Sequence, residues 1–188
     1  SPSPVPDASR RVVVHRLSSD FAAATRVVSA PTPVPKRGEV LIERRWTGVN
    51  ASDVNFTAGR YFGGAKKAAA LLPFDAGFES VGVVAALGPG VAEAHPDLIP
   101  GQPVATTTYG GFSEYAVAPA KLVVPVPEAS PAATALLTSG LTASIAMERL
   151  GGISAFAGAN ARPSPPERRR TVLVTAAAGG TGQVAVQL

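Results

Sequence analysis

The chain has 188 residues, of which 46% are hydrophobic, and its formal net charge is +4. This length allows one domain of ordinary size and part of a second, and no run approaches the roughly 18 apolar residues that a membrane-spanning helix needs. The absence of cysteine excludes disulfide bonds and thiolate metal sites, and it is typical of a reducing compartment. We therefore expect an intracellular protein without a membrane span, in the cytoplasm or in an organelle.

The first part of the chain has the pattern of a small β-rich domain. Residues 1–9 are rich in Pro and Ser and are predicted to be a disordered tail. Short β-branched runs separated by Gly and Pro follow, at the spacing expected of a closed β-rich domain over 10–130. The predicted strands cover residues 11–16, 22–28, 40–46, 79–87, 102–107, 111–117 and 122–125. Short helices are predicted at 51–57, capped by Asn50 or Ser52, and around 66–71.

The composition changes at residue 131. Residues 131–150 are rich in Ala, Leu and Thr and are predicted to be helical, with a break near Ser139-Gly140. Residues 154–170 are of low complexity and predict a flexible insertion. The arginine cluster at 168–170 lacks the interleaved aromatic residues of a nucleic-acid-binding surface, so a solvated loop is favoured and no nucleic-acid partner is expected.

A glycine-rich turn, Ala178-Gly179-Gly180-Thr181-Gly182, follows a predicted strand at 172–175. Glycines let the backbone come close to a pyrophosphate, and the next helix, predicted near Gln183, directs its free N–H groups and positive dipole end at the phosphates. We therefore predict that Gly179, Gly180, Thr181 and Gly182 bind a dinucleotide, with a ligand-free turn as the alternative. The acidic residue that separates NAD from NADP would stand about 20 residues further on, beyond Leu188.

Six segments occur in a family-specific order. They are GVNASDVN at 48–55, GRY at 59–61, PFDAGFESVG at 73–82, GFSEY at 111–115, SGLTA at 139–143 and the glycine turn. Together they resemble the medium-chain dehydrogenases/reductases, on the quinone oxidoreductase and enoyl reductase branch that includes the prostaglandin reductases.

This resemblance implies a fold and a function. It implies a GroES-like substrate domain built on a β-barrel over 10–130, followed by the first βα unit of a Rossmann NADP-binding domain over 131–188. It also implies an active site between the two domains, where NADPH reduces a small molecule such as an enone, an enoyl thioester or a quinone. A full-length member of the family is expected to be a homodimer.

The resemblance also marks where a catalytic zinc would bind. The zinc-dependent branch has a cysteine at the position of Asn50, a histidine at Phe78 and a third ligand near Ser139. An amide and a phenyl ring do not provide the three protein ligands that catalytic zinc needs, and the two histidines, His15 and His95, are isolated in the sequence. We therefore predict no bound metal.

Three residues match positions that carry chemistry in the family. Tyr61 matches the proposed proton donor of the enoyl thioester reductases, and a phenol is protonated at neutral pH; lining the cleft is its alternative role. Asn50 matches an asparagine near the nicotinamide ribose or the substrate carbonyl, and it can also cap a helix. Thr142 matches a threonine at the nicotinamide end of NADPH, and its alternative role is a helical threonine bonded back to a carbonyl. Glu79 stands in an apolar run, so we expect a structural partner, such as Arg60 or a backbone turn, rather than a catalytic role.

The sequence thus predicts an NADPH-dependent, zinc-independent oxidoreductase that reduces an activated carbon–carbon double bond or a quinone. The 188-residue chain alone is expected to be inactive and to bind NADPH weakly, because it lacks the adenosine side of the pocket. A non-catalytic GroES-like module that acts through protein contacts remains the alternative. The length of the parent transcript would separate the two hypotheses.

Overall fold

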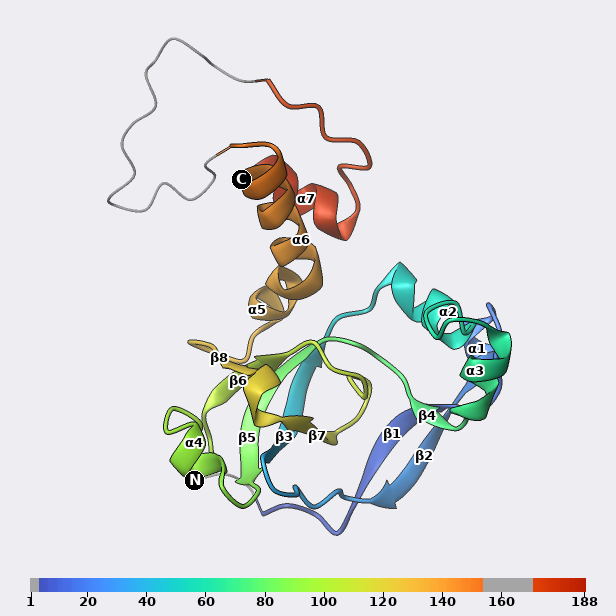
Figure 1. Ribbon diagram of the computed structural model, residues 1–188, viewed down its shortest axis with the longest axis vertical. Coiled ribbons are helices and arrows are strands. Elements are labelled where there is room, and N and C mark those ends of the chain that lie inside the picture. Colours follow the sequence, from blue (N-terminus) through green and yellow to red (C-terminus); the bar gives the residue numbers. More distant parts are fainter. Residues whose placement is uncertain (1–3, 154–170) are drawn as a thin grey trace. The chain divides into compact units, whose positions relative to one another are not determined.

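The computed structural model describes residues 4–153 and 171–188 and divides the chain into two compact units, Ser1–Thr134 and Ala135–Leu188 (Figure 1). The border lies within the helical segment predicted to begin at residue 131. The predicted flexible insertion at 154–170, with its arginine cluster, lies outside the described residues. Among the described residues, every helix is too short or too polar to cross a membrane.

A three-stranded sheet in the order β2-β1-β4 opens the first unit. Strand β1 (Ala8–Val14) pairs antiparallel with the full length of β2 (Thr25–Pro31) and with the short β4 (Phe74–Asp75). A helical turn, α1 (Phe21–Ala24), connects β1 to β2, and the Asp20 carboxylate accepts the Ala23 N–H at 3.1 Å as its N-cap. This cap satisfies a backbone donor of the first turn, so the chain is helical where the predicted strand 22–28 begins.

The prediction of a disordered tail over 1–9 is wrong for Ala8 and Ser9. These two residues belong to β1 and pair with Pro31 and Ala30 of β2. Their backbone N–H and C=O groups thereby enter a ladder of hydrogen bonds. Proline content alone does not reveal such pairing, because the partner strand stands far along the sequence.

A five-stranded antiparallel sheet forms the larger part of the first unit, in the order β7-β3-β5-β6-β8 (Figure 1). Its strands are β3 (Glu39–Thr47), β5 (Ser80–Leu87), β6 (Pro103–Thr106), β7 (Tyr115–Pro119) and β8 (Val123–Pro125). These confirm the predicted strands with one exception, since the strand predicted from residue 111 begins only at Tyr115. The N–H groups of Gly111 and Phe112 instead donate to Gly77 and Ala76, which draws this loop toward the other sheet.

The core of the first unit lies between these strands and short helices α4 (Val91–Ala94) and η1 (Ala120–Leu122). Its main buried cluster consists of Val40, Ile42, Val84, Val91, Leu98, Val104, Ala118, Ala120 and Val123. A second cluster beside the smaller sheet contains Val14, Ala24 and Ala76. Each fully buried valine or isoleucine contributes about 1.5–3 kcal/mol to stability. The five-stranded sheet, with the larger cluster, therefore provides most of the unit's apolar burial.

Strand β3 leads directly into the candidate site. Its pairing with β5 is irregular between Arg44 and Trp46, and such a bulge bends a strand and redirects its side chains. Helix α2 (Ala51–Thr57) follows, as the sequence predicts, and then α3 (Ala65–Ala70). The two helices lie beside the three-stranded sheet (Figure 1).

All the regular structure in the described residues of the second unit is helical, and its first helix begins at the end of the first unit. Helix α5 (Pro131–Ala135) continues without interruption through η2 (Leu136–Gly140), α6 (Leu141–Ile145) and η3 (Ala146–Leu150). The predicted break at Ser139-Gly140 is instead a widened turn of π-type hydrogen bonds. Helix α7 (Gly180–Gln187) packs against η2 and α6.

The predicted strand at 172–175 is not formed. Residues 171–174 have no regular structure, and 175–178 form a turn before α7. A parallel strand exists only beside a neighbouring strand, and the described residues of this unit contain no strand that could pair with it. Only the helical half of the predicted βα unit is therefore present.

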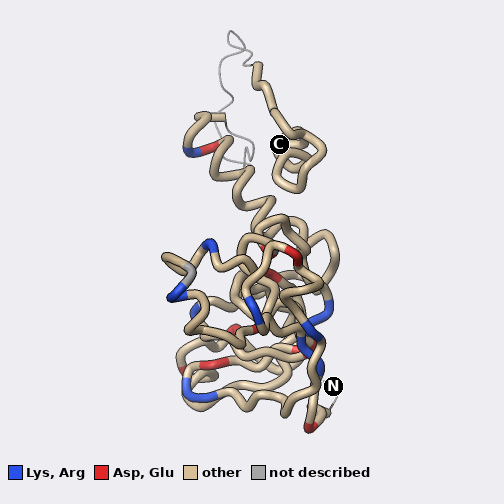
Figure 2. The backbone as a smooth tube through the Cα atoms, turned by 90° about the vertical axis from the view of Figure 1, so that its right-hand side faces the viewer, with Lys and Arg blue, Asp and Glu red and all other residues tan. Residues whose placement is uncertain are grey.

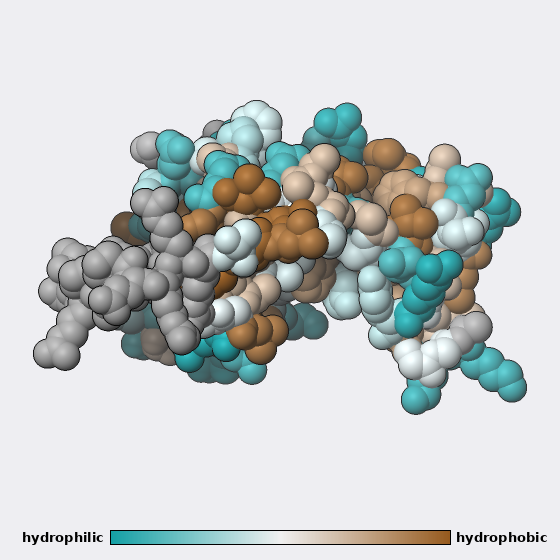
Figure 3. Space-filling model, turned by 90° about the horizontal axis from the view of Figure 1, so that it is seen from above, coloured by the Kyte–Doolittle hydropathy of each residue, from teal (hydrophilic) through white to brown (hydrophobic). Residues whose placement is uncertain are grey.

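The second unit exposes apolar rather than charged side chains. Its described residues include only two charged ones, Glu148 and Arg149, in contrast to the first unit (Figure 2). Hydrophobic side chains are exposed on its surface, and some are visible beside the grey residues in Figure 3. The exposed large hydrophobic residues of this unit are Leu136, Leu141, Ile145, Leu150, Val172, Leu173 and Val186.

Candidate active site

Three polar side chains form a group where β3 meets α2, and we call it the Asn50 cluster: the half-buried Asn50 and the buried Asp53 and Glu79. Asn50 stands at the N-cap of α2, and its backbone N–H donates to Asp53 Oδ2 at 2.8 Å. Its side-chain Nδ2 donates to Glu79 Oε1 at 2.7 Å. Asp53 and Glu79 are each only 4% exposed. Buried carboxylates need such partners, so the cluster fixes the orientation of the Asn50 amide.

Gly48 makes room for this cluster. A Cβ at this position would lie 2.1 Å from Glu79 Oε1, far inside van der Waals contact. The Gly48 N–H and the Thr47 hydroxyl both donate to the Glu79 carbonyl oxygen, at 3.2 and 2.8 Å. The glycine of the GVN motif thus lets the chain that leaves β3 pass close to the Glu79 side chain.

The cluster changes the acidity of Asp53. Burial raises the pKa of the Asp53 carboxyl above its usual range, the hydrogen bond from the Asn50 N–H lowers it, and the charge of Glu79 raises it. Burial is the largest of the three causes, because a carboxylate loses its hydration there.

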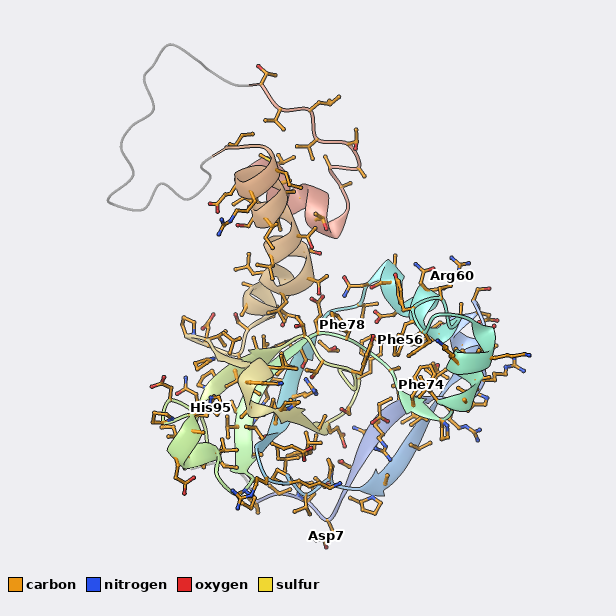
Figure 4. The ribbon with its side chains drawn as sticks, viewed as in Figure 1. Asp7, Phe56, Arg60, Phe74, Phe78 and His95 are labelled. Carbon is orange, nitrogen blue, oxygen red and sulfur yellow. The ribbon has the colours of Figure 1, made fainter. Side chains whose placement is uncertain are left out.

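The structure supports two predictions about this region and overturns one. Asn50 lies at the start of α2, as a capping residue must, and its side chain is held by a carboxylate rather than free. Glu79 has a structural partner, but the expected partner Arg60 is wrong. Arg60 Nη1 instead donates to Asn55 Oδ1 at 2.7 Å, and its side chain lies toward the outside of α2 (Figure 4). The short separation of Arg60 from Asn55 along the chain explains this choice.

Tyr61 lies on the turn after α2 and is 56% exposed. Its hydroxyl accepts a long hydrogen bond of 3.4 Å from Asn55 Nδ2. The phenol therefore stays accessible within this unit, and its hydrogen is available for another acceptor.

A group of aromatic rings lies next to the Asn50 cluster. We call it the aromatic cluster, and its members are Phe56, Phe62, Phe74, Phe78 and Tyr109. Phe56 stacks on Tyr109 with ring centroids 4.4 Å apart, and Tyr109 also contacts Phe78 at 5.5 Å. Phe56, Phe74 and Phe78 are labelled in Figure 4. Tyr109 is 51% exposed, so one side of its ring remains open.

Sequence reasoning missed Tyr109. It follows β6, in the loop before Gly110-Gly111, and no motif marks it. An aromatic residue that directly precedes two glycines at the end of a strand is the only signal that could have drawn attention to it. Its position became clear only from its stacking on Phe56 of a distant helix.

The three positions at which the resemblance places zinc ligands hold other groups here. Asn50 is engaged with Glu79, Phe78 packs against Tyr109, and Ser139 lies beside Gly180. No cluster of three or more His, Cys, Asp or Glu residues suited to a metal ion occurs in the described ranges 4–153 and 171–188. His95 lies at α4, on the far side of the five-stranded sheet from α2 (Figure 4).

The glycine turn lies in the second unit and shows why small residues are needed there. A Cβ on Gly182 would lie 2.2 Å from the carbonyl oxygen of Ala176, and one on Gly180 would lie 2.7 Å from Ser139 Oγ. Helix α7 begins at Gly180, three residues before the predicted start. Its first N–H groups, those of Gly180, Thr181 and Gly182, have no partner within an α-helix. Gly179, Gly180 and Thr181 are exposed, so an anion can approach this turn.

Thr142 belongs to the same unit. It is exposed on α6, one turn after Ser139 in the continuous helix, and α7 packs against this segment. The structure thus brings Thr142 and the glycine turn onto neighbouring helices. Asn50 and Tyr61 lie in the first unit, so the predicted site residues form two groups.

Comparison with known proteins identifies the first unit. Residues 36–128 match the alcohol dehydrogenase GroES-like domain family. The chain is 45% identical to prostaglandin reductase-3 of Bos taurus over 99% of its own length and 44% of that protein. It is 40% identical to a probable quinone oxidoreductase of Leishmania amazonensis over 97% of its length and 48% of that protein. The chain thus spans less than half the length of the curated relatives it matches.

A solved structure extends the comparison to the fold. The quinone oxidoreductase of Thermus thermophilus, described together with its NADPH complex, is 30% identical and superposes with a TM-score of 0.66. The match covers 94% of this chain and 48% of that protein. The predicted fold class is confirmed as a sheet-rich GroES-like domain followed by a partial Rossmann-like segment. The chain therefore belongs to the medium-chain dehydrogenase/reductase superfamily, with quinone oxidoreductases and prostaglandin reductase-3 among its relatives.

Proposed function

We propose that this chain is the N-terminal portion of an NADPH-dependent oxidoreductase that reduces an activated carbon–carbon double bond or a quinone without zinc. The observation that carries the proposal is the Asn50 cluster, which holds an amide beside open aromatic rings. Several solved relatives of the chain are described in complex with NADPH. Relatives named prostaglandin reductase-3 and quinone oxidoreductase support the reaction class.

The glycine turn fits the phosphates of a dinucleotide. The exposed glycines leave space for a pyrophosphate, and Gly182 lets α7 begin close to the Ala176 carbonyl. The N–H groups of Gly180, Thr181 and Gly182, with the Thr181 hydroxyl, would hold the phosphate oxygens. Thr142 would bind the carboxamide at the other end of the cofactor. NADPH, when bound, supplies the hydride.

Asn50 and Tyr61 act on the substrate in this proposal. The Asn50 amide donates one hydrogen to Glu79 and retains a second, which can stabilise an oxygen that gains negative charge. The Tyr61 hydroxyl is accessible and donates the proton that the α-carbon of the substrate needs. Glu79 holds Asn50 in place and does not itself transfer a proton.

Tyr109 supplies the binding surface for the substrate. Enones and quinones are flat and conjugated, and a flat π-system stacks favourably on an open aromatic ring. Tyr109 offers such a ring, because Phe56 supports one face and half of its surface is exposed. We expect Tyr109→Ala to raise KM several-fold and Tyr109→Phe to leave KM nearly unchanged, since the ring and not the hydroxyl makes the contact.

The decisive experiment measures NADPH oxidation by the full-length protein with a quinone and with an enone. Tyr61→Phe is expected to lower kcat with the enone at least tenfold while the Kd for NADPH is retained. Tyr115→Phe is the matched control, because it removes the same hydroxyl from a residue on β7 that belongs to neither the Asn50 cluster nor the aromatic cluster. Turnover by Tyr61→Phe at the rate of Tyr115→Phe would remove Tyr61 from the mechanism, and no turnover of either substrate would reject the proposal.

Zinc independence has its own test. Two carboxylates are the only zinc donors in the Asn50 cluster, one fewer than catalytic zinc needs, and both accept hydrogen bonds from Asn50. Asn50 and Phe78 stand where the resemblance places two ligands of the zinc-dependent branch. We expect less than about one-tenth of a zinc ion per chain by elemental analysis of the full-length protein, and unchanged activity after chelation. Stoichiometric zinc would refute this part of the proposal. The same preparation also tests the expected homodimer by its mass in solution.

A further inference from the structure

A cavity of about 400 Å³ lies in the first unit, apart from the Asn50 cluster and Tyr61. We call it the arginine cavity. It is lined by parts of β1, β2 and β3 and by the loop before β7, and its larger side chains are Arg10, Arg11, Arg44, Arg45, Trp46 and Phe112. Its volume is in the range of small-molecule sites. No step of the proposed reaction uses it.

Three of the four arginines have carboxylate partners. Arg10 pairs with Glu114 at 2.6 Å, and Glu114 also lines the cavity. Arg11 pairs with Asp75 at 3.3 Å, and Arg45 pairs with Glu43 at 3.0 Å. Arg44 has no ion pair among the described residues. The four arginines together therefore have one positive charge more than their carboxylate partners neutralise among the described residues.

Arg44 is also the arginine whose hydrogen bonds are incomplete. Its Nη1 donates to the hydroxyls of Ser80 and Thr106, the latter at 3.0 Å. Its Nε and Nη2 are buried and have no hydrogen-bond partner among the described residues, and the same holds for Nε of Arg11. Nε and Nη2 together form one edge of the guanidinium fork, which matches the two oxygens of a carboxylate.

A buried charge without a partner is unfavourable. Burial lowers the pKa of Arg44 to about 10, because the guanidinium loses its hydration. Side chains in this state are normally paired or hydrogen-bonded, and three unpartnered nitrogens around one cavity point to a missing acceptor. The missing group must accept hydrogen bonds, because arginine offers donors only. An anion fits best, because Arg44 has no counter-charge among the described residues.

We propose that the arginine cavity binds a small organic carboxylate with an apolar body. The carboxylate oxygens would take the free edge of Arg44 and Nε of Arg11, while the body would lie against Trp46 and Phe112. Since these nitrogens of both arginines are closed to water, the carboxylate reaches them through rotamer changes of Arg44 and Arg11. The apolar walls favour a carboxylic acid over inorganic phosphate, which would gain nothing from them.

Thermal denaturation of the 188-residue chain with benzoate tests this proposal. Benzoate at 10 mM, about ten times the Kd we expect, should raise the melting temperature by a few degrees. Benzamide, which has the same shape without the charge, should leave it unchanged. Equal shifts with benzoate and benzamide would overturn the proposal, as would an equal shift with inorganic phosphate.

Variants connect the shift to the cavity. Arg44→Met should weaken benzoate binding at least tenfold, while Arg26→Met, on the exposed surface of β2, should leave it unchanged. Arg44→Lys serves as a second variant that keeps the charge and loses the fork, and it should also weaken binding. Trp46→Ala, at a half-exposed position, should weaken binding of benzoate and not of formate. Retained benzoate binding in both Arg44 variants would overturn the proposal.

Discussion

The Asn50 cluster and the arginine cavity both lie near the end of β3, and they use their buried polar atoms differently. In the Asn50 cluster, the side chains of the chain itself complete one another, through Asn50 Nδ2 on Glu79 and the Asn50 N–H on Asp53. In the arginine cavity, nitrogens of Arg44 and Arg11 have no partner among the described residues. The comparison teaches that a completed polar group fixes geometry, whereas an incomplete one is suited to an external ligand.

The largest expected effect comes from breaking the completed group. Asn50→Asp replaces a donor with an oxygen 2.7 Å from Glu79 Oε1 and places a third carboxyl group beside two buried ones. We expect a loss of about 3 kcal/mol in the free energy of unfolding at pH 7, measured by urea denaturation. The loss should shrink below pH 5, where a protonated carboxyl can donate again.

Asn55→Asp provides the control for this prediction. Asn55 lies on the same helix, and its Oδ1 accepts from Arg60, so a carboxylate is tolerated there. Equal stability of Asn50→Asp and Asn55→Asp would show that the Asn50 amide is not held by Glu79.

A smaller loss of stability is expected when a side chain at position 48 crowds the Asn50 cluster. Gly48→Ala places a Cβ 2.1 Å from Glu79 Oε1, and a buried, hydrogen-bonded carboxylate cannot move away freely. We expect the free energy of unfolding, measured by urea denaturation, to fall by about 2 kcal/mol. Gly38→Ala is the comparison variant, because Gly38 has a φ of +76° and nothing within 4 Å of its Cβ position. Any loss of stability in Gly38→Ala comes from backbone strain alone, whereas the loss in Gly48→Ala comes from crowding against Glu79. If Gly48→Ala is as stable as the parent chain, Glu79 does not rest against Gly48.

The incomplete group predicts a change of the opposite sign. Arg44→Met removes an unpaired buried charge and keeps an apolar side chain of similar length, so the chain should gain about 1 kcal/mol in an anion-poor buffer. The same urea denaturation measures this gain, and Arg26→Met should show none. A loss of stability would mean that the bonds from Arg44 to Ser80 and Thr106 outweigh the cost of burying the charge.

Local patterns were sufficient for much of the fold. The strand at 40–46 and the helix at 51–57 follow from β-branched runs and a capping residue, which act over a few positions. The strand at 172–175 was predicted from the same kind of pattern and did not form, because pairing depends on a neighbouring strand. Ala8 and Ser9 show the reverse case, since a distant partner makes a strand of a segment that looks like a tail.

The candidate site shows the same limit. Asn50, Tyr61 and the glycine turn are recognisable because each belongs to a short motif. The partner of Glu79 was predicted wrongly, and Tyr109 and Arg44 were missed, because their roles arise from contacts between residues far apart in the sequence. Sequence reasoning therefore found the groups with a motif and not those created by packing.

The smallest expected effect tests the electrostatics inside the completed group. Burial raises the pKa of Asp53 in the folded chain, the Asn50 N–H opposes this, and the Glu79 charge adds to it. As the pH rises above the usual aspartate pKa of 3.8, the unfolded chain releases this proton first, so the free energy of unfolding falls until the pH passes the raised pKa. Asp53→Asn keeps an acceptor for the Asn50 N–H and should remove this fall. The variant should match the parent chain at the lowest pH and exceed it slightly near pH 7, whereas Asp97→Asn, on an exposed loop, should follow the parent throughout.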